Sequence, residues 1–112
     1  MHVHIVAVGK IKERGLRDAI DDYAKRIALE VNGKSLTSHG LADLVAHAEQ
    51  TAVPTLAFLI GGAYGLPPAT SRAADAQISL SKLTLPHRLA RLVLAEQLYR
   101  AFTILRGEPY SH

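Results

Sequence analysis

The stretch LSKLTLPHRLARLVLAEQLYRAF, residues 80–102, decides how this chain folds. It begins as a loop of Ser, Lys, Thr and Leu, passes through Pro86 and His87, and continues as a helix predicted over residues 88–106. One stripe of this helix is purely apolar and can cover a sheet: Ala90, Leu94, Leu98, Ala101 and Leu105. A second apolar set lies on its other sides: Leu92, Val93, Tyr99, Phe102 and Ile104. We expect a second copy of the chain to cover this set, and the alternative is one wide-faced core helix in a monomer.

The rest of the chain alternates apolar strands with helices. Strands are predicted over residues 3–9, 28–31, 55–60 and from 78 into the loop before Pro86, the second of them closed by an Asn32-Gly33 turn. Helices are predicted over residues 41–50, capped by Thr37 or Ser38, and briefly after the prolines at 67 and 68. A further helix follows the first strand, with apolar residues at helical spacing: Leu16, Ala19, Ile20, Tyr23 and Ile27. This order predicts an α/β fold, a mostly parallel sheet with helices on both faces.

Length and composition narrow the class of protein. A chain of 112 residues with 48% hydrophobic and 21% charged residues is expected to form a single domain, residues 1–112. The absence of cysteine excludes thiolate nucleophiles and cysteine zinc sites. No stretch reaches membrane-spanning length, so we expect a cytoplasmic protein without a membrane partner. A net charge of +3 permits a polyanionic partner without requiring one, and the basic residues of the last helix can equally be solvated.

Few polar patterns point to a site. Glycines follow the third strand in LIGGAYGL, residues 59–66, where ligands bind in open α/β sheets. Their G-G-x-x-G spacing matches neither the dinucleotide fingerprint nor the P-loop, and a plain tight turn remains the alternative. His2 and His4 have no third ligand nearby, so we predict no metal site. No nucleophilic triad is visible.

Several stretches taken together resemble one family. HIVAVGKIKE, LEVNGKSLTSHGLA, FLIGGAYGL, the stretch LTLPH with the helix containing EQLYRA, and the closing RGEPYSH occur in order and cover nearly the whole chain. They resemble the bacterial 23S rRNA (pseudouridine-N3) methyltransferase H family of the SPOUT class. The resemblance implies a SPOUT-like fold with a C-terminal trefoil knot, a homodimer, and methyl transfer from S-adenosyl-L-methionine to N3 of a pseudouridine in 23S rRNA of the assembled ribosome.

The resemblance also assigns residues to roles. It places the cofactor on three segments of the chain, at Leu29, Gly61, Gly62, Leu80, Ser81, Lys82, Leu83, Thr84 and Leu85. The candidates for assisting the reaction are His87, Arg100 and Tyr110, as a proton acceptor, an anion stabiliser and a base-positioning residue. Each has a plainer alternative: His87 as a helix cap, Arg100 as the ion-pair partner of Glu96, and Tyr110 as a packed tail.

The chain departs from the family at one junction. Members carry a further strand and helix before the strand resembling LEVNGK, whereas here residues 26–28 bridge the gap with no turn residue. A missing strand–helix unit of about 30 residues or more matches this difference. The unit lies at the sheet edge in SPOUT folds, so the pocket is expected to survive, while the RNA-facing surface is in doubt. The alternative function is therefore a catalytically silent minimal knotted dimer that binds the cofactor or the ribosome without methylating.

Overall fold

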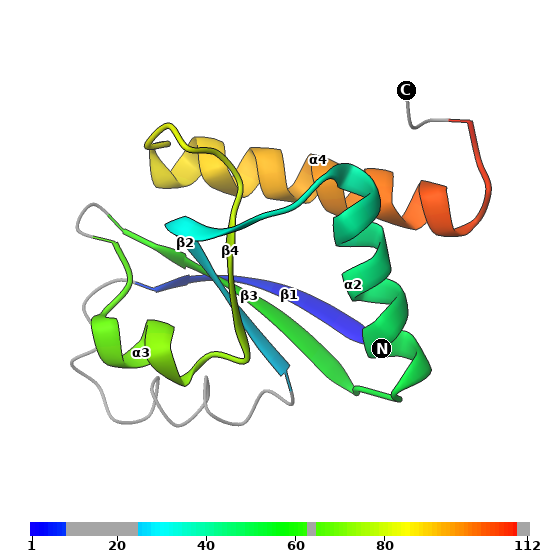
Figure 1. Cartoon of the computed structure of the whole chain (residues 1–112), viewed down its shortest axis with the longest axis horizontal. Coiled ribbons are helices and arrows are strands. Elements are labelled where there is room, and N and C mark those ends of the chain that lie inside the picture. Colours follow the sequence, from blue (N-terminus) through cyan, green and yellow to red (C-terminus); the bar gives the residue numbers. More distant parts are fainter. Residues whose placement is uncertain (9–24, 63–64, 110–112) are drawn as a thin grey trace.

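Four parallel strands form the sheet on which the molecule is built. The computed structural model describes residues 1–8, 25–62 and 65–109. The strands are β1 (His2–Val8), β2 (Lys25–Ser35), β3 (Thr55–Gly61) and β4 (Ala76–Ser79), and they lie in the order β1-β3-β2-β4 (Figure 1). Every pairing between these strands is parallel. The parallel α/β sheet predicted from the alternation of elements is confirmed.

The strand β3 lies inside the sheet because its sequence TLAFLI is apolar on both sides. Leu56, Phe58 and Ile60 face one hydrophobic core, and Ala57 and Leu59 face the other. All five side chains are buried. A strand with no polar face is stable only where both of its faces are covered, which is the central position it occupies.

The strand β1 lies at an edge of the sheet, and the prediction that it is buried is wrong for most of its length. Only Val8 is buried, while His2, His4 and Ala7 are exposed. The apolar composition of the strand resembled that of a central strand. Its edge position leaves the amino-terminal part accessible, because β3 pairs with it on one side alone within the described residues.

Helices lie on both sides of the sheet, as predicted. The helices α2 (Ser38–Gln50) and α4 (His87–Leu105) pack on the larger core, and the short helix α3 (Pro68–Ala73) lies on the opposite side (Figure 1). The helix α3 itself buries no residue. Leu66 and Ala74, which flank α3 in the sequence, pack in the smaller core instead. Of the two predicted caps, Thr37 and Ser38, it is Thr37 that caps α2: its Oγ1 accepts a hydrogen bond of 2.9 Å from the Gly40 amide.

The strand β2 differs most from the sequence prediction. It begins at Lys25 and continues through Asn32 and Gly33 to Ser35, so the predicted turn at Asn32-Gly33 is wrong. A Cβ on Gly33 would lie 2.7–2.9 Å from backbone atoms of Ile78 and Gln77, so glycine permits close approach to β4 instead of a turn. The pairing shifts register there, between Leu29 and Lys34.

The first predicted helix is corrected at its carboxyl end. Ile27, expected on that helix, is fully buried in β2. The other apolar positions named for this helix lie outside the described residues. Ile27 is an apolar β-branched residue that suits either the helical or the strand period, and the pairing of β2 with β3 makes it part of a strand.

The helix α4 buries most of its predicted stripe. Ala90, Leu94, Leu98 and Ala101 are buried, whereas Leu105 is 39% exposed and Thr103 is buried instead. The Thr103 hydroxyl donates a hydrogen bond of 2.7 Å to the Arg100 carbonyl, which satisfies this polar group inside the core.

The second apolar set of α4 is divided between packed and exposed side chains, with Val93 partly buried. Phe102 and Ile104 pack against the core of their own chain. Leu92 and Tyr99, in contrast, are 65% and 54% exposed. The surface left for a partner is therefore narrower than the sequence suggested, and Leu92 marks it most clearly.

Candidate cofactor pocket

A pocket of about 560 Å³ opens at the carboxyl end of β3, beside the middle of β2. Its walls come from Leu29, Glu30 and Val31 of β2, from the end of β3, and from the segment that joins β4 to the start of α4. Strands that run parallel bring their carboxyl ends to one edge, where open α/β sheets bind ligands. The volume lies within the range of about 300–1,000 Å³ that is usual for small-molecule sites.

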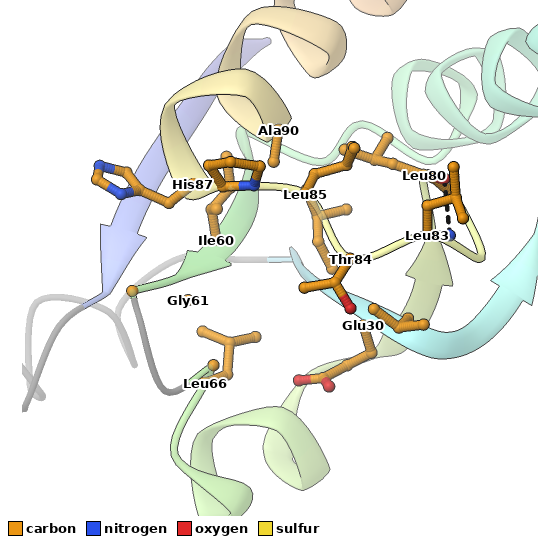
Figure 2. A pocket seen from close by; sticks show the side chains of 16 residues that line it. Glu30, Ile60, Gly61, Leu66, Leu80, Leu83, Thr84, Leu85, His87 and Ala90 are labelled. Atoms are coloured by element: carbon orange, nitrogen blue, oxygen red, sulfur yellow. Dashed lines mark hydrogen bonds between the residues drawn. The ribbon is translucent and has the colours of Figure 1, made fainter.

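Most of the predicted cofactor residues meet in this pocket. Eight of the nine line it: Leu29, Gly61, Gly62, Leu80, Ser81, Leu83, Thr84 and Leu85. Figure 2 shows the leucines of the loop on one wall and Gly61 with Leu66 on the facing side. Lys82 does not line the pocket and is exposed. Three segments that are distant in sequence thus form one mainly apolar chamber.

Glycine at position 61 sets the shape of the pocket floor. A Cβ there would lie 2.3 Å from the Gly65 carbonyl carbon and 2.4 Å from the Leu66 nitrogen. The chain returns on itself at this point, since the Gly65 amide donates a hydrogen bond of 3.0 Å to the Gly62 carbonyl. Gly65 has φ +78°, a left-handed conformation that glycine adopts without strain. The glycine turn is therefore a close approach of two backbone segments beside a cavity.

The loop after β4 is ordered by its own serines. The Ser79 hydroxyl donates a hydrogen bond of 3.0 Å to the Ser81 carbonyl, and the Ser81 hydroxyl accepts one of 2.9 Å from the Leu83 amide. Leu80 and Leu85 pack against the larger core, whereas Leu83 is 75% exposed at the pocket. An exposed leucine beside an apolar cavity offers contact area to a flat ligand.

The three candidates for assisting the reaction lie in different places. His87 lines the pocket as the first residue of α4, and Figure 2 shows its imidazole extending away from the loop that carries Leu83 and Thr84. It does not cap the helix, because the N-cap is Pro86 and no side chain makes a capping hydrogen bond. Tyr110 lies outside the described residues.

Arg100 does not reach the pocket of its own chain. At about 1.5 Å of rise per residue it lies roughly 20 Å along α4 from His87. It pairs with Glu96, whose carboxylate accepts a hydrogen bond of 3.0 Å from Arg100 Nε. The Gln97 amide donates a bond of 2.8 Å to the same carboxylate, and the Ser38 hydroxyl donates one of 2.6 Å to Gln97. The ion pair that was the plainer alternative is thus present and is joined to the start of α2.

Several lining residues were not singled out from the sequence. They are Glu30, Val31, Ile60, Gly65, Leu66, Pro86 and Ala90. The place of Glu30 and Val31, directly after a predicted ligand residue and near the carboxyl end of a strand, was the available signal. The signal is weak for Glu30, because a charged residue within a strand is also typical of a solvent-exposed position.

Two further observations concern other kinds of site. The described helices include none that is both long and apolar enough to cross a membrane. Within the described ranges, no cluster of three or more His, Cys, Asp or Glu side chains is arranged to hold a metal ion.

The parallel sheet with a pocket at the end of a strand is typical of an α/β protein that binds a small molecule, and comparison with known sequences identifies its family. The model of a family described as predicted SPOUT methyltransferase matches residues 27–112. The chain belongs to the SPOUT methyltransferase family, and the resemblance recognised in its motifs is confirmed.

Relatives of the chain share one name. It is 44% identical over 145 residues to the ribosomal RNA large subunit methyltransferase H of Sorangium cellulosum, with all of both chains covered. The proteins of the same name from Clostridium botulinum (strain Kyoto / Type A2) and Clostridium beijerinckii are 36% and 32% identical over 157 residues, with 98% of this chain and 99% of each relative covered. These matched lengths exceed the 112 residues of this chain, as expected of a shortened member. The family match begins at residue 27, beside the junction where the missing unit was located.

Proposed function

We propose that this protein transfers a methyl group from S-adenosylmethionine to N3 of a pseudouridine in 23S rRNA of the assembled ribosome. The observation that carries the proposal is the convergence of eight assigned residues, from three separate segments, on one pocket. Membership of the SPOUT methyltransferase family and the names of the relatives support an rRNA substrate. Such a substrate also implies that the protein works in the bacterial cytoplasm.

The residues present fit this cofactor. Adenine is flat and uncharged, and Leu80, Leu83 and Leu85 offer an apolar slot whose backbone amides and carbonyls can read its edge. Glycine at position 61 lets the backbone of Gly65 and Leu66 approach closely on the facing side of the pocket. When bound, S-adenosylmethionine supplies an electrophilic methyl group on a sulfonium centre. The work left to the chain is to orient the acceptor and to manage one proton.

The acceptor nitrogen carries a proton that must leave as the new nitrogen–carbon bond forms. His87 stands at the pocket, and its imidazole is the candidate for accepting this proton. The imide is anionic once the proton has left, and a guanidinium stabilises such an anion through charge and paired hydrogen bonds. Arg100 is the candidate for this role, and Tyr110 is the candidate for positioning the base.

A second copy of the chain would solve the separation between Arg100 and the pocket. Leu92 and Tyr99 leave apolar surface exposed along α4, and a homodimer would cover it. In such a dimer Arg100 of one chain serves the pocket of the other. The knot belongs to the same proposal: the chain leaves β4 at one edge of the sheet and returns through the pocket loop to α4, which contacts α2, β3 and β1.

Methyl transfer to ribosomes tests the proposal directly. Purified protein, tritiated S-adenosylmethionine and 70S particles from a strain lacking the corresponding enzyme should give labelled 23S rRNA, with the label at N3 of a pseudouridine. Naked 23S rRNA should be a poor acceptor, because a chain of 112 residues with a net charge of +3 has little basic surface to hold RNA alone. Cofactor binding without any transfer would instead identify a silent knotted dimer.

Mixed dimers test the role of Arg100. Arg100→Ala should lower transfer at least about tenfold, a loss of about 1.4 kcal/mol, while cofactor affinity stays the same. Arg72→Ala, which removes an exposed arginine from α3, is the matched control. After exchange of Arg100→Ala with Gly61→Ala chains, half of the dimers are mixed and one site in each is intact, so about a quarter of the activity should return. No recovery would mean that Arg100 does not act across the dimer.

A further inference from the structure

The carboxylate of Glu30 is a charged group in the pocket to which neither the family motifs nor the proposed mechanism gives a role. Glu30 lies on β2 between Leu29 and Val31, and all three line the pocket. Figure 2 shows its carboxylate extending from the strand toward the side on which Leu66 lies, below Thr84 in that view. Its side chain is partly buried.

This carboxylate makes no hydrogen bond or ion pair within the described part of the chain. Two other acidic groups, in contrast, have partners: Asp75 accepts a hydrogen bond from the Arg26 amide, and Glu108 pairs with Arg106. A partly buried carboxylate that its own fold does not satisfy is costly unless a ligand or water does so.

The walls around Glu30 give the pocket a negative character. Glu30 is the one carboxylate among the described lining residues, and no lysine or arginine is among them. Lys82, the basic residue of the loop sequence, is exposed and does not line the pocket. The other ionisable lining residue is His87. A single charge within mainly apolar walls acts over a longer range than it would in water, because the surroundings screen it less.

The cofactor and its product differ by one charge. S-adenosylmethionine carries a sulfonium cation, and the thioether left after transfer, S-adenosylhomocysteine, does not. A negative pocket therefore attracts the substrate form more than the product form, whereas an apolar slot for adenine binds both alike.

We propose that Glu30 is a specificity residue that makes the pocket favour S-adenosylmethionine over S-adenosylhomocysteine by its charge. The inference rests on the proposed function and adds a role that the cofactor motifs do not contain. Its consequence is relief from product inhibition: the positive charge that draws the substrate in is lost in the reaction, so the product is held less tightly.

Calorimetry of the unmodified protein and of Glu30→Gln with both ligands tests the proposal without any methyl transfer. Glu30→Gln should weaken S-adenosylmethionine binding about tenfold, equivalent to about 1.4 kcal/mol, and change S-adenosylhomocysteine binding less than about threefold. Glu30→Asp keeps the charge and should retain most of the preference. Glu49→Gln, which removes an exposed carboxylate from α2, is the matched control and should change neither affinity.

The outcomes separate this proposal from the one on which it rests. Equal losses for both ligands in Glu30→Gln would overturn it, because the carboxylate would then bind a part that the two share, such as the ribose hydroxyls. Unchanged affinities would overturn it as well. If the unmodified protein binds neither ligand, the proposed function fails and this inference with it. If the unmodified protein binds both ligands and Glu30→Gln binds each with the same affinity as the unmodified protein, only the inference fails. Thermal melting of each variant verifies that it is folded.

Discussion

Replacing Gly61 by alanine should damage the pocket through backbone contacts that no side chain can relieve. The added Cβ would lie 2.3 Å from the Gly65 carbonyl carbon and 2.4 Å from the Leu66 nitrogen. Non-bonded carbon atoms sit about 3.5–4.0 Å apart, so one of the two backbone segments must move by about 1 Å or more. Leu66 is buried in the smaller core and lines the pocket, so the shift disturbs both.

The expected size of the effect follows from these contacts. Overpacking of this kind costs about 1–3 kcal/mol of the free energy of unfolding. For a chain of this length that corresponds to a fall in Tm of about 5–15 °C. The affinity for S-adenosylmethionine should fall at least about tenfold, since the moved segment is a wall of the pocket.

Thermal melting and calorimetry on three alanine variants provide the assay. Gly40→Ala is the control, because the nearest atom to its Cβ is Thr37 Oγ1 at 3.4 Å and alanine favours a helix by about 1 kcal/mol. Gly65→Ala separates backbone strain from crowding: its φ of +78° is unfavourable for alanine, yet nothing lies within 4 Å of the added Cβ. The reasoning is refuted if Gly61→Ala melts and binds the cofactor like the unmodified protein.

Three other predictions concern the dimer, the helix cap and the tail. Leu92→Asp should convert a dimer of twice 12.1 kDa into a monomer, because an unpaired charge buried in the interface costs several kcal/mol. Light scattering measures the mass, and His39→Asp is the exposed control. A monomeric unmodified protein would disprove the dimer. Thr37→Ala should lower the free energy of unfolding by about 1 kcal/mol in a denaturation titration, and Thr37→Ser should retain it; equal losses would argue against capping. The hydrogen bond from Arg106 holds the pKa of the Glu108 carboxyl below its ordinary value of 4.5, so the contact is present above pH 4.5 and is lost as the pH falls through the lowered pKa. Arg106→Ala should restore an ordinary pKa to Glu108 in an NMR titration, and an unchanged titration would contradict this.

The tail prediction follows from how α4 ends. Gly107 has φ +71° and its amide bonds to the Ile104 carbonyl at 3.1 Å, while the Glu108 amide bonds to the Thr103 carbonyl at 2.9 Å. This is the Schellman arrangement in which glycine terminates a helix. It sets the direction in which the chain leaves α4.

The local sequence was sufficient to predict those elements whose residue pattern fits a single structure. The run TLAFLI could only be a strand covered on both faces, and β3 is buried along it. Thr37 was recognisable as a cap because its hydroxyl stands three residues before an amide that the helix leaves unbonded. The motifs also identified the family, which periodicity alone would not have reached. The eight pocket residues followed from that resemblance and not from their spacing.

Tertiary structure decided wherever one local pattern fitted two environments. Asn32-Gly33 is a turn signal in isolation, yet the approach of β4 to Gly33 makes it part of a strand. The neighbours of β1 made it an edge strand, although its composition suited the interior.

The site shows the same division between local and distant interactions. The family resemblance assigned Arg100 and the cofactor residues to one function, and the helix between Arg100 and His87 holds Arg100 away from the pocket within one chain. Glu30 lay in a predicted strand and was given no role, and only the folded chain places it beside the loop after β4 as a lining residue of the pocket. Strand and helix periods depend on neighbours a few residues away and can be read from the sequence. Which surfaces meet depends on contacts between distant segments, and these arise only when the chain folds.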